Sequence, residues 1–120
     1  VNMLDEGAVD RDGSILDYCR LHDITIQAWS PFQHGFFSGV FIDNPDFPEL
    51  NEALSQVAQA HGVSSTTIAV AWILRHPAKI QVVTGTTRPE RLLESKAAFD
   101  VQLTRDEWYK IYLAAGNILP

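Results

Sequence analysis

The stretch Val82-Val83-Thr84-Gly85-Thr86-Thr87-Arg88-Pro89-Glu90-Arg91 predicts the passage from a strand into a helix. Its β-branched beginning is typical of a strand, and the glycine that follows allows a close approach of the backbone. Thr87 and Glu90 have the Thr-x-x-Glu spacing of a capping box, which predicts that a helix starts here. Pro89 fits the first helical turn, where its missing N–H costs nothing.

Two arginines add anion-binding chemistry to the start of this helix. The unpaired N–H groups of a first helical turn attract an anion, and the guanidinium groups of Arg88 and Arg91 suit a phosphate. One interpretation is therefore a phosphate-binding helix start. The other is an ordinary capped strand–helix unit with arginines in solvent, and the stretch taken alone favours that interpretation.

The composition indicates one globular domain, or part of one. The 120 residues are 46% hydrophobic and 20% charged, and the net charge of −6 argues against a general binder of nucleic acid or anionic membranes. The single cysteine, Cys19, excludes an internal disulfide. The longest apolar run, Ile68 to Leu74, is too short to span a bilayer. We therefore expect a cytoplasmic protein.

The beginning of the sequence predicts an interrupted element. Val1 to Leu4 is a short strand candidate that runs into an acidic loop from Asp5 to Gly13. Residue 1 is not methionine, and no cap precedes the apolar start. We therefore expect that the segment was cut from a longer protein.

A helix is predicted from Ser14 to about His22. Ser14 and Asp17 have the spacing of a capping box, and the helix has Ile15, Leu16 and Cys19 on one face. Cys19 and His22 stand one turn apart, but no second ligand pair has metal-site spacing. This favours a buried thiol and a surface imidazole over a metal site.

A strand and a long loop follow. The β-branched run from Ile24 to Trp29 predicts a strand that ends at Ser30-Pro31, because proline donates no ladder hydrogen bond. The segment from Pro31 to Pro48 is long for a loop and rich in phenylalanine, which is typical of functional loops. Its aromatic side chains lie either on a ligand or on the protein itself, and composition leaves both open.

Two helices are predicted next. The first runs from Glu49 to His61 and ends at Gly62, which suits a helix end. The second is capped by Ser64 or Ser65 and reaches Arg75. This second helix is apolar nearly all round, so we expect it to be buried, with Trp72 in the core.

The last part of the sequence predicts one strand and two helices. The strand runs from Gln81 to Thr84, and a helix from Arg88 to about Ala98 follows the opening stretch. Thr104 to Glu107 forms a capping box for a last helix, which ends at Gly116. The side chains expected to point inward from this last helix are Trp108, Ile111, Tyr112 and Ala115.

Strands separated by helices predict parallel pairing with right-handed crossovers. The three predicted strands would leave both edges of a small sheet bare, which proteins normally avoid by closing a barrel or by pairing. We therefore expect an α/β fold that forms part of a barrel, with residues 1–120 as a single partial domain.

Two motifs resemble those of the aldo-keto reductase family. Trp29-Ser30-Pro31-Phe32, with Gly35 just beyond, is similar to the aromatic-Ser-Pro-Leu-x-x-Gly signature of that family. The run from Gly85 to Leu92 is similar to its C-terminal motif, a Gly/Lys-Ser/Thr turn before Pro-Glu-Arg. The resemblance covers essentially the whole chain. It implies the C-terminal fragment of a TIM (β/α)8 barrel, with strands six (partial) to eight, their helices and a C-terminal helix.

The resemblance implies an oxidoreductase that transfers hydride between NADPH and an aldehyde or ketone. Trp29 matches the aromatic residue that stacks on the nicotinamide ring. Ser30, Phe32 and Gly35 match the loop that contacts the pyrophosphate, where hydroxyl and backbone N–H groups suit an anion.

The second motif matches the residues that hold the adenosine end of the cofactor. Arg91 matches the principal cation for the 2′-phosphate, while Gly85 stands where the family often has a lysine, a loss that Arg88 would offset. Glu94 and Ser95 match the pair that contacts adenine. The full set of implied residues at this end is Gly85, Thr86, Thr87, Arg88, Arg91, Glu94 and Ser95.

The family's catalytic Asp, Tyr, Lys and His come from the first four strands, and no residue of this sequence matches them. We therefore expect no catalytic residue and no metal site in this chain, and no carbonyl reduction by the chain alone. Its implied partners are the cofactor, a small carbonyl substrate and the missing N-terminal part of the barrel. The alternatives are a non-catalytic, self-associating binding module and a stable proteolytic remnant, which would also self-associate to cover its sheet edges.

Overall fold

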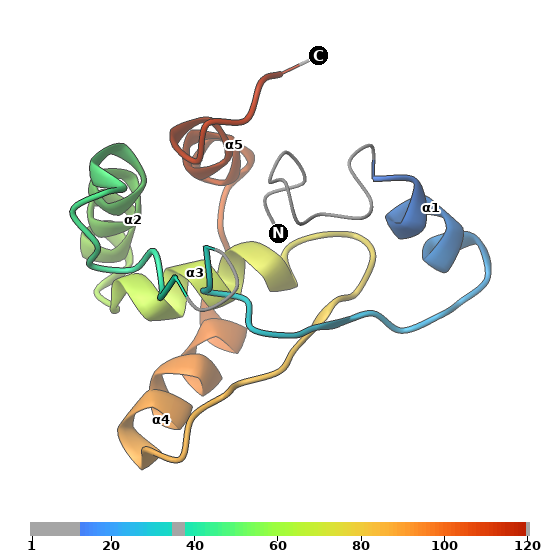
Figure 1. Cartoon of the computed structure of the whole chain (residues 1–120), viewed down its shortest axis with the longest axis horizontal. Coiled ribbons are helices and arrows are strands. Elements are labelled where there is room, and N and C mark those ends of the chain that lie inside the picture. The colour runs from blue at the N-terminus through green and yellow to red at the C-terminus, as the bar shows by residue number, and fades with distance from the viewer. Residues whose placement is uncertain (1–12, 35–37, 120) are drawn as a thin grey trace.

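The computed structural model describes residues 13–34 and 38–119, so the strand expected at Val1 to Leu4 lies outside the described residues. Figure 1 shows an α/β arrangement in which helices surround a short central α3 and two strands. In chain order the elements are α1 (Ser14–Leu21), β1 (Gln27–Ala28), α2 (Pro48–His61), α3 (Ser65–Leu74), β2 (Gln81–Val82), α4 (Pro89–Ala97), the 3-10 helix η1 (Ala98–Asp100) and α5 (Arg105–Ala114).

Helix α3 is the centre of the core, as its apolar sequence predicts. It packs against α2, α4, η1 and β2, and Figure 1 shows it between α2 and α4. Its buried residues are Thr67, Ile68, Ala69, Val70, Ala71 and Ile73. No single helix in the described ranges is long and apolar enough to cross a membrane, and α2 and α3 reach that length only as a pair bent by 92°. Burial in the core explains why α3 is so apolar.

Three of the predicted helix boundaries are confirmed by their capping interactions. Gly62 follows α2 with φ 66°, a left-handed conformation that glycine adopts without strain. The Ser64 hydroxyl accepts the N–H of Thr67 at 3.2 Å and so caps α3. At the start of α5, the Thr104 hydroxyl accepts the N–H of Glu107 at 3.2 Å, and the Glu107 carboxylate accepts the N–H of Thr104 at 2.7 Å.

The sheet has two parallel strands in the described part of the chain. Gln27 pairs with Gln81 and Ala28 with Val82, so the predicted parallel arrangement is confirmed. Both strands are shorter than the sequence predicts. Among the described residues each strand has a neighbour on one side only, and residues without a ladder partner are not held in strand geometry.

Helix α1 forms where the sequence predicts it, but its start and its packing differ from the prediction. Gly13, with φ 77°, is the N-cap and Ser14 is already helical, so the predicted Ser14–Asp17 capping box is wrong. None of its residues is buried, and Leu21 is 79% exposed. The apolar face of α1 is therefore only partly covered by the described residues, with Leu16 and Cys19 half-buried.

Two tryptophans join α3 to α5 by a reciprocal pair of hydrogen bonds. The indole N–H of Trp72 donates to the carbonyl of Trp108 at 3.0 Å, and the indole N–H of Trp108 donates to the carbonyl of Trp72 at 3.0 Å. The two indole rings are stacked, with their centroids 4.6 Å apart. The ring of Tyr112 also stacks on that of Trp108, with 5.5 Å between the centroids. Trp72 is half-buried and belongs to the packing of the core, as predicted.

Candidate functional site

The two family-like motifs follow neighbouring strands at the same edge of the sheet. Because β1 and β2 are parallel and Ala28 pairs with Val82, the residues that follow them leave the sheet side by side. Val83 extends this contact, since its N–H donates to the carbonyl of Ala28 at 3.1 Å. The carboxyl ends of parallel strands are where α/β folds bind ligands, so this edge is the candidate site.

Trp29 and Ser30 come directly after β1. The Trp29 side chain is 69% exposed, which leaves a large aromatic surface uncovered by the described residues. Ser30 has φ 47°, a left-handed conformation that is strained for a residue with a side chain. Such strain is typical of functional sites, because the surrounding structure must hold it in place.

The loop after Pro31 lies partly on the core. Phe32, Phe41 and Phe47 are half-buried and pack against the hydrophobic core, and the Phe32 and Phe41 rings meet edge to face at 6.2 Å. For these three side chains the structure favours packing on the protein itself. Gly35, the remaining loop residue of the motif, lies outside the described residues.

The second motif enters α4 without the capping box that the sequence predicts. Arg88 is the N-cap and makes no side-chain capping bond, so the predicted Thr87–Glu90 box is wrong. The Thr86 hydroxyl instead accepts the N–H of Arg88 at 3.1 Å, which moves the helix start one residue on, with Pro89 in the first turn.

The absence of that capping box leaves the start of α4 open. The N–H of Leu92 donates to the carbonyl of Arg88 at 3.3 Å, whereas the N–H groups of Glu90 and Arg91 have no partner in the described part of the chain. The side chains of Arg88 and Arg91 are exposed and make no ion pair with a described residue. Thr87 is also exposed. The result is a group of free donors and positive charge at one helix end.

The two predicted adenine contacts differ in their surroundings. Glu94 is half-buried, and its carbonyl accepts the hydroxyl of Thr67 at 3.0 Å. Ser95 is only 9% exposed, and its hydroxyl donates to the carbonyl of Arg91 at 2.9 Å. The adenine contact of Ser95 stays a prediction, and the burial of its hydroxyl counts against it. Gly85 is exposed, with open space where a side chain would lie.

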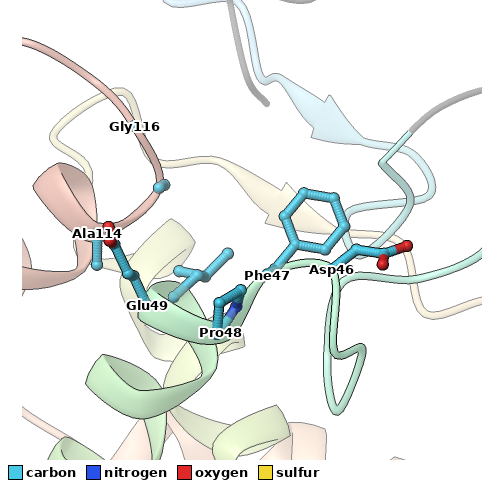
Figure 2. Close-up of a pocket in the computed structure, with 8 residues that line it drawn as sticks. Asp46, Phe47, Pro48, Glu49, Ala114 and Gly116 are labelled. Atoms are coloured by element: carbon cyan, nitrogen blue, oxygen red, sulfur yellow. The ribbon is translucent and has the colours of Figure 1, made fainter.

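A separate open pocket of about 310 Å³ lies between the start of α2 and the end of α5 (Figure 2). None of the predicted site residues lines it. Its lining residues are Asp46, Phe47, Pro48, Glu49, Leu50, Ala114, Ala115 and Gly116. The pocket is therefore distinct from the carboxyl ends of β1 and β2, after which the two motifs follow.

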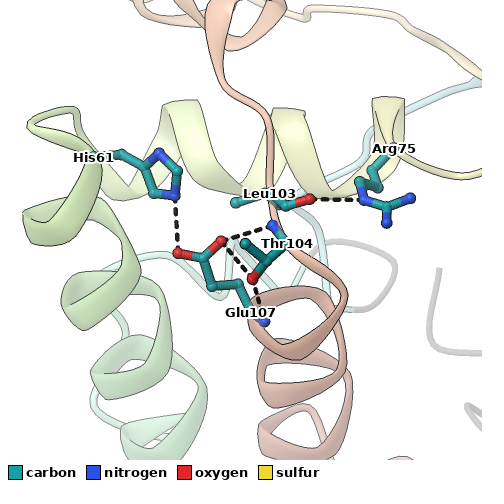
Figure 3. Close-up of polar contacts among 5 residues, drawn as sticks. All are labelled: His61, Arg75, Leu103, Thr104 and Glu107. Carbon is teal, nitrogen blue, oxygen red and sulfur yellow. Dashed lines mark hydrogen bonds and ion pairs between the residues drawn. The ribbon is translucent and has the colours of Figure 1, made fainter.

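The main polar cluster outside the site is structural (Figure 3). His61, the last residue of α2, contacts the Glu107 carboxylate at 2.9 Å, and the same carboxylate completes the Thr104 capping box of α5. The backbone hydrogen bond from Thr104 lowers the pKa of Glu107. Arg75 donates to the carbonyl of Leu103 at 2.8 Å and further ties α3 to this segment. In the described residues no group of three His, Cys, Asp or Glu side chains could hold a metal ion.

Comparison with known proteins assigns the family. The sequence profile of the aldo/keto reductase family matches residues 2–114, so the chain belongs to the aldo/keto reductase family. It is similar to two bacterial proteins named 6-dehydroglucose reductase. The one from Agrobacterium fabrum is 36% identical over 104 residues, and the one from Novosphingobium aromaticivorans is 35% identical over 106 residues.

The structural comparison agrees with the family assignment. A crystal structure of a thermostable aldo-keto reductase in complex with the inhibitor epalrestat superposes with a TM-score of 0.67 at 25% identity, over 97% of this chain and 37% of that one. The chain covers 33% and 34% of the two 6-dehydroglucose reductases, while 85% and 88% of the chain itself is matched. It therefore spans about a third of the length of these relatives.

Proposed function

We propose that the chain is the C-terminal, cofactor-binding part of an NADPH-dependent aldo-keto reductase. In this proposal β1 and β2 are strands seven and eight of a (β/α)8 barrel, and α1 precedes strand seven. The observation that carries the proposal is the parallel register of Ala28 with Val82, because of which the chain continues to Trp29-Ser30 and to Arg88–Arg91 from the same edge of the sheet. In barrels of this kind ligands bind at that edge.

The start of α4 has the chemistry that a phosphate requires. Two backbone N–H groups at a helix N-terminus, those of Glu90 and Arg91, have no partner among the described residues, and the helix dipole there favours an anion. The guanidinium groups of Arg88 and Arg91 add charge-assisted donors, and the Thr87 hydroxyl adds a neutral one. We infer that these groups hold the 2′-phosphate of NADPH, with Arg91 as the principal cation.

We assign the nicotinamide and pyrophosphate end of the cofactor to the residues after β1. The exposed Trp29 ring supplies a flat surface for the nicotinamide, and Ser30 supplies a hydroxyl near the pyrophosphate. When bound, NADPH supplies the hydride that reduces a carbonyl group. The acid that protonates the product oxygen comes from the part of the barrel that precedes this chain. The names of the two bacterial relatives make 6-dehydroglucose the first carbonyl substrate to test.

Substitution of Arg91 tests the proposal directly. In the complete polypeptide that contains this chain, we expect Arg91→Ala to raise the Kd of NADPH by about ten- to a hundredfold, since hydrogen bonds between charged groups contribute roughly 1.5–3 kcal/mol. The Kd of NADH should change by no more than about twofold, because NADH lacks the 2′-phosphate that Arg91 would bind. Fluorescence titration with each cofactor measures both values.

Lys96→Ala is the matched control, because Lys96 is an exposed cation in the last turn of the same helix. This variant should bind both cofactors like the wild type. An equal loss of NADPH and NADH affinity in Arg91→Ala would remove the role assigned to Arg91. A complete polypeptide that binds neither cofactor would overturn the proposed function itself.

A further inference from the structure

We propose that Asn51, on the first turn of α2, positions the loop residues Phe32–His34 and Val40–Phe47 for cofactor binding. The inference rests on the proposed function and on the resemblance that assigns Phe32 to the loop beside the pyrophosphate. Asn51 does not belong to either family-like motif, and its position in a helix gives no sign of the role in the sequence. It acts through the backbone of the loop, so it is a positioning residue and not a ligand.

The side-chain amide of Asn51 makes four hydrogen bonds with the loop, three through Nδ2 and one through Oδ1. Its Nδ2 donates to the carbonyl of Phe41 at 2.8 Å, to that of Phe47 at 2.9 Å and to that of Asn44 at 3.1 Å. Its Oδ1 accepts the N–H of Asp43 at 2.8 Å. An amide offers two donor hydrogens and an acceptor oxygen, and here both kinds of group bind the same seven-residue segment.

Phe41 connects Asn51 to the cofactor-binding motif. Its carbonyl accepts from Asn51, and its N–H donates to the carbonyl of Phe32 at 3.0 Å. An antiparallel bridge between Gln33 and Val40 continues the same pairing by one residue. The backbone of Phe32 is therefore two hydrogen bonds away from the Asn51 side chain.

A second connection runs through Asn44. Its carbonyl accepts from Asn51, and its own side chain donates to the carbonyl of Val40 at 3.2 Å. The same Nδ2 atom lies 3.5 Å from Nε2 of His34, which follows Phe32 closely in the chain. Two independent connections from one residue fix the loop more firmly than either does alone.

Loss of Asn51 should loosen the loop without unfolding the protein. The carbonyls of Phe41, Asn44 and Phe47 each accept a second hydrogen bond, from the backbone N–H of Asn44, Phe47 and Asn51 respectively. An aspartate at position 51 would have the same shape but no donor when ionised, and its charge would face three carbonyl oxygens. Asn51→Asp is therefore the sharpest variant, and Asn51→Ala is the second.

The experiment compares cofactor affinity with turnover in the complete polypeptide. We expect Asn51→Asp to raise the Kd of NADPH by about tenfold, the equivalent of one net hydrogen bond, while kcat at saturating NADPH stays within about twofold. The defect of Asn51→Asp should shrink as the pH is lowered, because a protonated carboxyl regains a donor, whereas the defect of Asn51→Ala should not. The control is Asn117→Ala, which removes an asparagine that donates to the carbonyl of Tyr112 outside the loop.

The outcomes separate this inference from the proposed function. A wild-type polypeptide that binds no nicotinamide cofactor would overturn both. Wild-type binding with unchanged affinity in both Asn51 variants, or an equal loss of affinity and kcat, would overturn the role of Asn51 alone. If neither variant folds, hydrogen exchange of the wild type decides, because NADPH should slow exchange at the amides of Phe41 and Asp43. Unchanged exchange at both amides would contradict the inference.

Discussion

The backbone carbonyl of Trp72 depends on a residue far away in the sequence for its hydrogen-bond donor. At the end of α3, the N–H of His76 donates to Ile73 instead of Trp72, and Pro77 has no N–H to offer. Among the described residues, the Trp72 carbonyl is therefore bound by the indole of Trp108. The Trp108 carbonyl is different, because it lies inside α5, where the helix itself supplies a donor four residues on.

Trp108→Phe should consequently destabilise the protein more than Trp72→Phe. We expect the first to lower the free energy of unfolding by about 1–3 kcal/mol, because it leaves a carbonyl unpaired in the packed contact between α3 and α5. Trp72→Phe should lower the free energy of unfolding by about 1 kcal/mol or less, since the Trp108 carbonyl loses the indole donor but keeps its donor within the helix. Urea unfolding of the complete polypeptide measures both.

Tyr109→Phe is the control for this pair, because Tyr109 lies on the same helix and is exposed. It should leave the free energy of unfolding unchanged. Equal losses in Trp72→Phe and Trp108→Phe would show that the two carbonyls are equivalent, and that the helix end of α3 does not set the difference.

At the scale of the elements, the chain contains two Thr-x-x-Glu sequences that behave differently. Thr104 caps α5, whereas Thr87 makes no capping bond to α4. We therefore expect Thr104→Ala to cost about 1 kcal/mol in the free energy of unfolding, as is usual for a lost N-cap. Thr87→Ala should change it by less than about 0.5 kcal/mol, as for most exposed positions. A loss of similar size in both variants would mean that Thr87 does cap α4.

The elements that could be predicted are those with local signals. Gly62, Ser64 and the Thr104 capping box are correct because their partners lie within four residues. The predicted Thr87 capping box is wrong because the Thr86 hydroxyl accepts the N–H of Arg88, and the helix then starts one residue later than predicted. The predicted strand lengths are wrong because the length of a strand depends on its neighbours in the sheet, which lie far away in the sequence.

For the candidate site, the parallel pairing of the two strands is confirmed, while the roles of the site residues stay predictions. Two short motifs mark Trp29 and Arg91, and parallel pairing predicts that they share an edge. The role of Asn51 was not predictable, because its partners are loop carbonyls whose placement depends on the folded loop. The Trp72–Trp108 contact joins residues 36 apart in sequence, beyond the reach of any local pattern.

At the scale of the whole molecule, much apolar surface is left uncovered by the described residues. Leu93 is 66% and Phe99 76% exposed on the side of α4 and η1, and α1 buries no side chain. The outer edges of the two-stranded sheet also have no partner strand among the described residues. Relatives of this chain are about three times as long, and we infer that the surface is covered by the remainder of a barrel.

The isolated 120-residue chain should therefore self-associate and should not oxidise NADPH. Bare strand edges and exposed apolar side chains favour pairing between copies, and under the proposed function the catalytic residues come from a part of the barrel outside these 120 residues. Sedimentation velocity over a range of concentrations should show dimers or larger species, and replacing Leu93 and Phe99 together by lysine should shift them toward monomer. Lys96→Ala, on the same helix, should not. A monomer at every concentration would contradict the inference that this surface requires a covering, and NADPH oxidation by the isolated chain would contradict its lack of catalytic residues.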